Sequence, residues 1–189
     1  MPIYEAIHAE RCSLFPLESR DREDVAAIYR SEKVRLYLGG PVSGSVFEQK
    51  FDSLLGGIDA RQWAVRDRTV GRFIGLVALS QHHDGHDVEV SYQLLPAFWG
   101  KGFATEAVGA VVHYALSTLG LPRLLAETQA ANLRSRRLLE KLGMTAARYV
   151  VRFGVEQIVY ERTRSRDDEI APDGDPAPAC RPGGQPGLA

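Results

Sequence analysis

The segment from Val88 to Leu116 constrains the fold of this chain more than any other stretch. It begins with an alternating apolar run, Val88–Leu95, whose period of two is typical of a strand. Pro96 ends that strand because it has no N–H to donate, and the glycines of Gly100–Lys101–Gly102 allow a tight turn. From Phe103 onward the apolar residues recur at three- and four-residue spacing, which predicts a helix. The predicted order is therefore strand, glycine loop and helix.

A glycine loop at the start of a helix is a candidate binding site for a phosphate group. The first turn of a helix has N–H groups without a partner and about half a unit of positive charge. Two familiar phosphate loops do not fit this sequence. The P-loop needs glycine at the position of Leu95 and Ser or Thr at the position of Gly102. A dinucleotide-binding loop needs Gly or Ala where Thr105 stands. The alternative is a turn that joins strand to helix and binds nothing.

The loop and its flanks resemble motif A of the GNAT superfamily of acyl-CoA-dependent N-acyltransferases, written Q/R-x-x-G-x-G/A. The motif corresponds to residues 99–104, with Trp99 in place of Gln or Arg. The longer match, WGKGFATEA, is similar to the RimJ/RimL-like branch, which contains ribosomal-protein N-terminal acetyltransferases. Residues 132–144 resemble motif B, N-x-x-S/A-x-x-L-Y-x-K-x-G-F, and follow motif A at the family's spacing. With an entrance at Phe15-Pro16-Leu17, the resemblance covers residues 12–162.

The resemblance implies acetyl-CoA as the cosubstrate and no metal. In this family motif A gives backbone N–H groups to the pyrophosphate of CoA, and the strand before it carries the pantetheine arm. The implied cofactor-binding residues are Leu94, Leu95, Gly100, Lys101, Gly102, Phe103, Ala104, Thr105 and Asn132. A simpler role stays open for two of them. Lys101 can be a solvated surface charge, and Asn132 can serve only as the N-cap of the helix that follows it.

Two catalytic residues, Glu89 and Ser135, are also implied by the resemblance. Glu89 occupies the position of a strand glutamate that acts as a base, often through water, in several family members. Burial in a cleft would raise its pKa toward neutrality. Many members carry a Tyr that protonates the leaving CoA thiolate, but Leu139 stands there. In the RimL-like branch the proposed donor is the Ser that maps to Ser135. The alternatives are a solvent-exposed or ion-paired Glu89, and a Ser135 that only lets the helix approach CoA.

Other polar groups have simpler interpretations. The loop from His82 to Asp87 is rich in possible metal ligands, and one imidazole there could carry protons in the cleft. Asp84-Gly85 already accounts for a turn, and we expect no metal. We expect His113 to pack in the core. The basic residues of the helix after Asn132 are expected to form a solvated face rather than a nucleic-acid surface.

The remaining patterns predict one α/β domain with a mixed, mostly antiparallel sheet flanked by helices on both faces. Predicted strands cover residues 12–17, 62–66, 73–80, 88–95, 123–129, 149–153 and 157–162. Predicted helices begin at Asp21, Ser45, Phe103 and Asn132. Residues 1–163 are expected to form the acetyltransferase domain. Residues 164–189 are rich in proline and glycine, so we expect a disordered tail that cannot bury enough apolar surface to fold.

Composition excludes several other classes. The formal net charge is −1, so no global field favours nucleic acid or an anionic membrane. No apolar run approaches the ~20 residues of a membrane-spanning helix. The N-terminus lacks the apolar region of a signal peptide, and the two cysteines, Cys12 and Cys180, lie at opposite ends of the chain. We therefore expect a cytoplasmic protein.

These observations predict an N-acetyltransferase that moves an acetyl group from acetyl-CoA to a primary amine. The acceptor would be a protein N-terminus or a small-molecule amine, and the protein a monomer or homodimer. One alternative is a non-catalytic acyl-CoA-binding module, which the Leu at position 139 keeps open. Another is an interaction protein that acts through the C-terminal tail.

Overall fold

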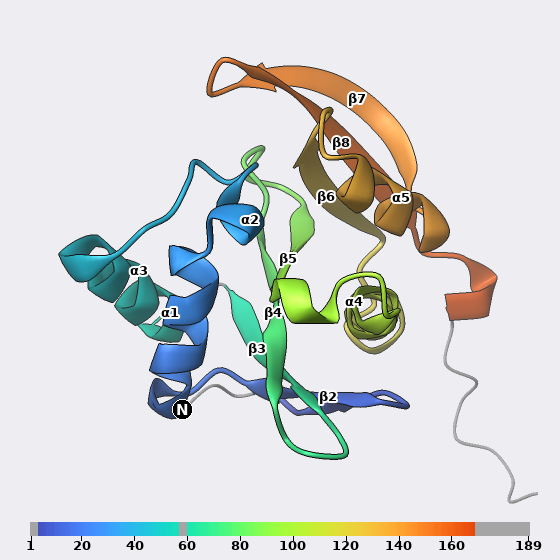
Figure 1. Ribbon diagram of the computed structural model, residues 1–189. Coiled ribbons are helices and arrows are strands. Elements are labelled where there is room, and N and C mark those ends of the chain that lie inside the picture. Colours follow the sequence, from blue (N-terminus) through green and yellow to red (C-terminus); the bar gives the residue numbers. More distant parts are fainter. Residues whose placement is uncertain (1–3, 57–59, 169–189) are drawn as a thin grey trace, which may run out of the picture.

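The structure is a computed structural model that describes residues 4–56 and 60–168 (Figure 1). Its centre is an eight-stranded sheet in the order β1-β2-β3-β4-β5-β6-β8-β7. The strands are β1 (Ile7–His8), β2 (Cys12–Pro16), β3 (Arg61–Asp67), β4 (Phe73–Gln81), β5 (Val88–Leu94), β6 (Arg123–Gln129), β7 (Thr145–Arg152) and β8 (Val155–Thr163). Neighbouring strands pair antiparallel, except for the parallel pair β5 and β6.

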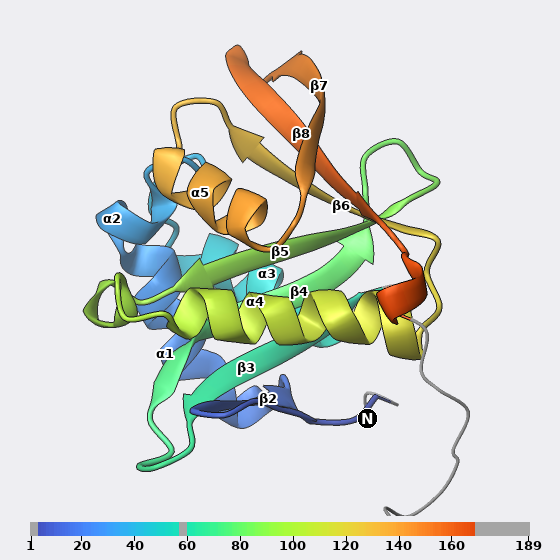
Figure 2. The same cartoon turned by 90° about the vertical axis from the view of Figure 1, so that its right-hand side faces the viewer.

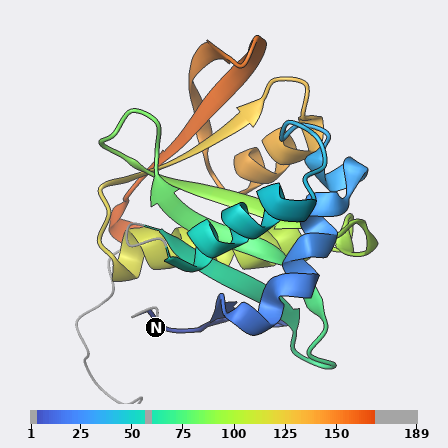
Figure 3. The same cartoon turned by 90° about the vertical axis from the view of Figure 1, so that its left-hand side faces the viewer.

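Helices cover both faces of the sheet. They are α1 (Arg22–Arg30), α2 (Glu32–Arg35), α3 (Gly44–Gly56), α4 (Phe103–His113) and α5 (Leu133–Lys141). Short turns are η1 (Ser19–Asp21), η2 (Pro96–Phe98), η3 (Tyr114–Thr118), which is π-helical and continues α4, and η4 (Arg166–Asp168). Figure 3 shows α1 and α3 across one face, with α4 behind the sheet. Within the described residues, none of these helices combines the length and the apolar character needed to cross a bilayer.

Two hydrophobic cores hold these layers together. Val25, Ile28 and Phe51 of α1 and α3 pack on Leu76 of β4 and its neighbours. On the other face, the apolar side of α4 packs on the inner residues of β2 to β6, and Leu139 of α5 joins the same cluster. The predicted α/β architecture, with helices on both faces of a mostly antiparallel sheet, is confirmed.

The parallel pairing of β5 with β6 is short. Only Val88 with Leu124 and Glu89 with Leu125 are partners. Beyond Glu89, β5 continues to Leu94 beside β4, while β6 continues beside β8. The two strands therefore separate and form a fork, which is visible in Figure 1 between β5 and β6. The fork leaves one edge of β5 without a strand partner in the described part of the chain, over the residues that lead to the glycine loop.

The structure corrects several predictions made from the sequence. Strand β1 was not predicted. Helix α3 begins at Gly44, so Ser45 lies within its first turn and is not its cap. Asp21 precedes α1 but does not cap it through its side chain. Its carboxylate instead accepts from the N–H of Glu18 at 2.9 Å and from Arg66 at 2.5 Å. His113 is exposed rather than packed in the core, because it lies on the side of α4 that faces away from the sheet.

The end of the chain is described only in part. The N–H of Arg164 donates to the carbonyl of Pro122 at 2.9 Å, and Asp168 is 4% exposed and pairs with Arg162 at 2.8 Å. Residues 169–189 lie outside the described residues, so the disorder expected for this segment stays a prediction.

Gly75 of β4 allows β5 to approach closely, and we predict that Gly75→Ala destabilises the fold. A Cβ at Gly75 would overlap the carbonyl oxygen of Gln93 and lie 2.8 Å from Cα of Leu94. Both are backbone atoms and cannot move aside cheaply, so we expect the free energy of unfolding to fall by about 1–3 kcal/mol. Chemical denaturation measures the change. Gly56→Ala is the control, because nothing lies within 4 Å of its Cβ position. Equal effects of the two substitutions would contradict this account.

Candidate active site

The glycine loop joins the end of β5 to the start of α4, as Figure 2 shows at the left end of α4. Gly100 and Gly102 have φ of +70° and +85°, in the left-handed region that favours glycine. Gly102 is the N-cap of α4. The predicted strand, glycine loop and helix are therefore confirmed as a local structure.

Backbone N–H groups line the mouth of α4. Within the described residues, the six N–H groups of residues 100–105 have no hydrogen-bond acceptor, and the N–H of Glu106 is the first to find one, Gly102 O at 3.1 Å. Gly100, Lys101 and Gly102 are exposed, and the Arg11 guanidinium lies at the edge of the mouth, where its Nη1 donates to the carbonyl of Lys101 at 3.0 Å. Consecutive free N–H groups at a helix start form a site for an anion. This mouth therefore has the chemistry that a pyrophosphate requires.

Trp99 fixes the end of β5 against the loop. Its indole Nε1 donates to the carbonyl of Leu94 at 2.8 Å. The N–H of Leu95 donates to Ile74 O at 2.9 Å, and its carbonyl accepts from Phe98 N at 3.0 Å. The N–H of Leu95 thus already has a partner. The backbone of Leu95 can contribute to a ligand only through the second lone pair of its carbonyl oxygen, and the Leu94 carbonyl likewise has one lone pair left beside the Trp99 indole.

Ser135 and Asn132 lie at the start of α5, on the far side of the fork from β5. Asn132 Oδ1 accepts from the N–H of Ser135 at 3.2 Å, so the N-cap predicted for this helix is confirmed. The hydroxyl of Ser135 is 2.6 Å from the hydroxyl of Tyr92, which comes from β5. Burial raises the pKa of Tyr92 to about 12. A hydrogen-bonded pair of hydroxyl groups therefore bridges the two walls of the fork.

Tyr92 is a polar group that the sequence reasoning did not single out. It lies within the alternating run Val88–Leu95, whose period indicates only a strand. Its residue type could have indicated a polar contact, because a buried tyrosine hydroxyl usually has a hydrogen-bond partner. Leu139, which occupies the family's tyrosine position, is 1% exposed and belongs to the core. The hydroxyl groups near the fork therefore come from Ser135 and Tyr92.

Glu89 lies where β5 and β6 separate, since its pairing with Leu125 is the last one between these strands. It is partly buried, and burial raises the pKa of its carboxyl group. His82 and His83 oppose the rise in pKa, Glu127 adds to it, and Arg152 opposes it to a smaller extent. The direction of this pKa shift is the one expected of a base in a cleft. The structure gives no contact between Glu89 and Ser135, which lie on different elements around the fork.

The loop before β5 is a compact turn. The His82 side chain is fully buried, with Nδ1 2.9 Å from Asp84 Oδ2 and Nε2 3.1 Å from Glu127 Oε2. Asp84 Oδ1 accepts from the N–H groups of His86 and Asp87, both at 3.1 Å. In the described ranges, no three His, Cys, Asp or Glu side chains are placed to hold a metal ion. His82 thus ties this turn to β6 through Glu127.

A small cavity of about 140 Å³ lies beside β5, on the face covered by α1 and α3. Its lining residues are Tyr29, Leu54, Gln62, Leu76, Ala78, Ser91, Tyr92 and Gln93. Because Tyr92 contributes to both this cavity and the fork, the cavity is a candidate place for a second substrate next to the strand.

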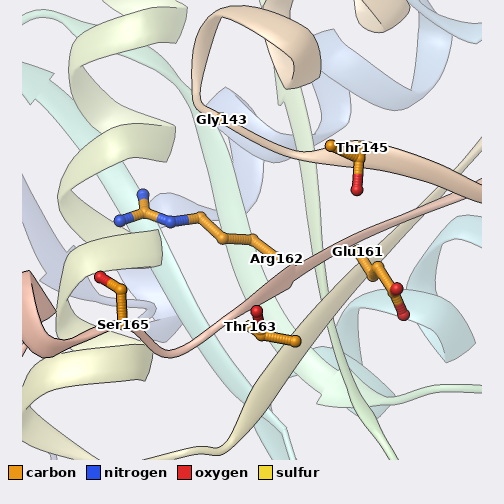
Figure 4. Close-up of a pocket in the computed structure, with 6 residues that line it drawn as sticks. All are labelled: Gly143, Thr145, Glu161, Arg162, Thr163 and Ser165. Carbon is orange, nitrogen blue, oxygen red and sulfur yellow. The ribbon is translucent and has the colours of Figure 1, made fainter.

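A larger hollow of about 300 Å³ lies elsewhere, where β7, β8 and the segment after β8 meet (Figure 4). It is lined by Gly143, Thr145, Glu161, Arg162, Thr163 and Ser165. The Arg162 guanidinium there is already paired with Asp168. None of the residues predicted for the site lines this hollow, so we place the site at the fork.

Comparisons with known proteins agree with this geometry. The family described as "Acetyltransferase (GNAT) domain" matches residues 11–145. The chain is 30% identical over 149 residues to a Bacillus subtilis protein named "Uncharacterized N-acetyltransferase YoaA", covering 75% of this chain and 83% of that protein.

Solved structures show the same fold. A GNAT-family acetyltransferase from Bacillus anthracis superposes with a TM-score of 0.75 at 22% identity, covering 84% of this chain and 98% of that one. Spermidine N-acetyltransferase from Vibrio cholerae, in complex with CoA and spermine, gives a TM-score of 0.72 at 19% identity, covering 82% and 96%. The family match spans most of the described residues and includes the strand, the glycine loop and the start of α5. This chain therefore belongs to the GNAT family of acetyltransferases and is an acyltransferase.

Proposed function

We propose that this protein transfers an acetyl group from acetyl-CoA to a primary amine by direct attack in a ternary complex. The observation that carries the proposal is the row of six free N–H groups at the mouth of α4, at the end of a strand whose edge is open. The row supplies the anion site that the CoA diphosphate needs, and the open edge supplies a path for its arm.

Acetyl-CoA would lie along the fork. Its pyrophosphate would contact the N–H groups of residues 100–105, and its arm would follow β5 from Leu94 toward Glu89. Five residues of strand cover about 17 Å. The N–H groups of β5 that face the fork have no strand partner, so one of them can donate to the thioester carbonyl and stabilise the oxyanion that forms there. Asn132 would face the arm from α5 while it caps that helix.

Glu89 would act as the base. The amine attacks only in its neutral form, and its pKa is about 7.7–8.0 for an α-amine and about 10.4 for lysine. A carboxylate with a raised pKa is a better proton acceptor than an ordinary one. Glu89, at the point where the strands separate, would take the proton directly or through water. The cavity beside Tyr92 would hold the acceptor.

Ser135 would stabilise the departing thiolate, whose pKa is about 8.5. Tyr92 keeps its proton because its pKa is raised to about 12. If Tyr92 donates to Ser135 Oγ, the Ser135 hydrogen is left to point toward the sulfur. The C–S bond then breaks with its electron pair on sulfur, which Ser135 hydrogen-bonds until a solvent proton neutralises it.

The finer assignments belong to the same proposal. The names of the relatives favour an enzyme over a non-catalytic module. The spermine bound in the Vibrio cholerae enzyme supports an amine as acceptor. We keep the RimJ/RimL-like branch, a protein N-terminus or small amine as acceptor, a monomer or homodimer, and a cytoplasmic location as proposals based on the sequence.

Thiol release tests the function directly. Purified protein with acetyl-CoA and a panel of peptides and small amines should release CoA thiol with at least one amine, and calorimetry should detect binding of acetyl-CoA without any amine. Gly102→Val is expected to abolish binding, because a β-branched residue at φ +85° is strained and its Cβ would lie 2.9 Å from Arg11. An absence of heat with acetyl-CoA for the wild type would refute the transferase proposal.

Glu89→Gln tests the base. The wild-type rate should fall as pH drops through the raised pKa of Glu89, because the carboxylate then becomes protonated. The variant should have a kcat about 10²–10⁴ lower than wild type. Its rate should also no longer fall at low pH in the way that the wild-type rate does. The measurement is kcat/KM from thiol release between about pH 5.5 and 9. The apparent pKa of the wild-type profile is then compared with the pKa of an ordinary glutamate, about 4.3. Exposed Glu156, on the hairpin of β7 and β8, provides the control Glu156→Gln.

Stability gives an independent measurement on the same variant. Because the folded pKa of Glu89 is raised, ionising it costs stability as pH rises through the interval between its ordinary and its raised pKa. Glu89→Gln should therefore be at least as stable as wild type at neutral pH. A stable variant with an unchanged pH–rate profile would exclude Glu89 as the base.

Ser135→Ala tests the hydroxyl pair. Losing a hydrogen bond to a charged group costs about 1.5–3 kcal/mol, so we expect kcat to fall by about 10- to 100-fold. Tyr92→Phe should give a smaller loss, because Ser135 keeps its own hydroxyl. Ser53→Ala, an exposed helical serine on α3, is the matched control. If Ser135→Ala stays within twofold of wild type, Ser135 has no part in thiolate departure.

A further inference from the structure

A chain of ion pairs joins the turn before β5, strand β6 and the outer strand β7. The His82 imidazole bridges two carboxylates, with Nδ1 2.9 Å from Asp84 Oδ2 and Nε2 3.1 Å from Glu127 Oε2. An arginine of β7 meets each of these carboxylates. Arg148 Nη2 lies 3.3 Å from Asp84 Oδ2, and Arg152 Nε lies 3.0 Å from Glu127 Oε1. Both oxygens of Glu127 are therefore held, one by His82 and one by Arg152.

The contact between His82 and Glu127 crosses over β5. His82 directly follows β4 and Glu127 belongs to β6, while β5 lies between these two strands in the sheet. Val90 of β5 and Ala126 of β6 pack in the core under α4. Glu89 and Glu127 are their sequence neighbours on these strands, so both point to the opposite face of the sheet. The imidazole that reaches Glu127 lies on that face as well.

The strand register brings the held carboxylate next to Glu89. Glu89 pairs with Leu125, and Glu127 is two residues farther along β6. On its other side Glu89 pairs with Ser80, which is two residues before His82. Diagonal neighbours of this kind in a sheet have Cα atoms on the order of 8 Å apart. The imidazole and the Glu127 carboxylate therefore flank Glu89 from the two adjacent strands.

The two carboxylates have different surroundings. The side chain of Glu127 is 11% exposed, and each of its oxygens has a partner. Glu89 is partly buried, and within the described residues its carboxylate forms no hydrogen bond and no ion pair. When two neighbouring carboxylates compete for a proton, the one without partners binds it more readily. The arrangement therefore directs a proton to Glu89.

The charged groups that act on Glu89 in the described part of the chain come from the loop before β5, from β6 and from β7. In the order of their effect on its pKa they are His82, His83, Glu127 and Arg152. Burial raises the pKa of Glu89 most, and of these four groups only Glu127 raises it further. Asp87 and Arg123 are also close to this end of β5, but they pair with each other at 2.5 Å. Their charges therefore largely cancel.

We propose that Glu127 is a positioning residue for the base: His82 and Arg152 fix its negative charge beside Glu89, and this charge favours transfer of the amine proton to Glu89. This inference rests on the proposed function, because it takes Glu89 as the base. As the nitrogen lone pair forms the new C–N bond, the N–H bond breaks and the proton binds to an oxygen of Glu89. Glu127 neither gains nor loses a proton in this step.

Glu127→Gln tests the charge while it keeps the size of the side chain. Without the negative charge, the pKa of Glu89 should fall. The pH at which the wild-type kcat/KM declines on the acidic side should therefore move down by about 0.5–1.5 units, as expected for one charge on the order of 8 Å away. Glu127→Asp keeps the charge and should restore at least half of the shift. A carbon-13 NMR titration of the Glu89 carboxyl, assigned with Glu89→Gln, measures the same midpoint without activity.

Arg152→Gln should move the midpoint in the other direction. It removes a positive charge near Glu89, while His82 still holds one oxygen of Glu127. The Glu89 carboxyl should therefore be half protonated at a higher pH than in the wild type. Glu140→Gln is the matched control, because Glu140 accepts from the Tyr160 hydroxyl at 2.9 Å but belongs to α5, on the opposite face of the sheet. It should leave the midpoint unchanged.

The outcomes separate this inference from the proposed function. If the Glu89 midpoint stays in place in folded Glu127→Gln, or moves equally in Glu140→Gln, the positioning role is refuted. The base proposal then still stands if Glu89→Gln loses the decline at low pH. If the wild-type rate does not follow the Glu89 titration, Glu89 is not the base and both fail. Should a thermal melt show that Glu127→Gln is unfolded, Arg152→Gln decides, and a midpoint that does not rise there refutes the role.

Discussion

The short ladder between β5 and β6 is the constraint on which the rest of the site depends. Each strand has a full-length partner on its other side, β4 for β5 and β8 for β6, so both stay rigid while they separate. Glu89 marks the point of separation, and the glycine loop follows the open end of β5. The contact between Tyr92 and Ser135 spans the gap and keeps α5 at a defined distance from β5. An extra pair of ladder bonds beyond Glu89 would close the path that a pantetheine arm needs.

The first N–H groups of α4 and of the loop before it have no protein acceptor in the described part of the chain, which is unfavourable for the folded state unless water or a ligand binds them. Six backbone donors without acceptors in the described residues must be satisfied by water or by a ligand. The first three belong to exposed residues and the other three to partly exposed ones, so water can reach them. The loop keeps its shape because bonds on both sides hold it: the Trp99 indole on the Leu94 carbonyl, and Arg11 on Lys101 and Glu106. Water bound at a rigid row of donors can be exchanged for phosphate oxygens without reordering the backbone. The loop is thus preorganised for an anion.

The sequence could predict the parts of this site that depend on local pattern. A change of period from two to about 3.6 marks the passage from β5 to α4, and Asn132 is an N-cap recognisable from residue type alone. Contacts between residues far apart in the sequence could not be predicted from local patterns. Asp21 pairs with Arg66, 45 residues away, and Tyr92 meets Ser135, 43 residues away. The fork could not be predicted either, because local pattern does not reveal how many residues of two strands pair. Strand β1 has two residues, too few to show a period.

Leu139 stands where many members of the family carry Tyr, and we propose that Ser135 with Tyr92 takes over the role of that tyrosine. Leu139 faces the core, where a phenol would need a hydrogen-bond partner among apolar side chains. Tyr92 places its phenol at the fork from the opposite wall, on β5, and meets α5 at Ser135. Its raised pKa keeps the phenol protonated, so Tyr92 can donate a hydrogen bond to Ser135 but would be a poor acid toward a thiolate. A site built this way does not need a strong acid at the sulfur. In the proposed mechanism it would need one hydroxyl hydrogen aimed at the leaving group, which the Tyr92–Ser135 pair would supply from two rigid elements.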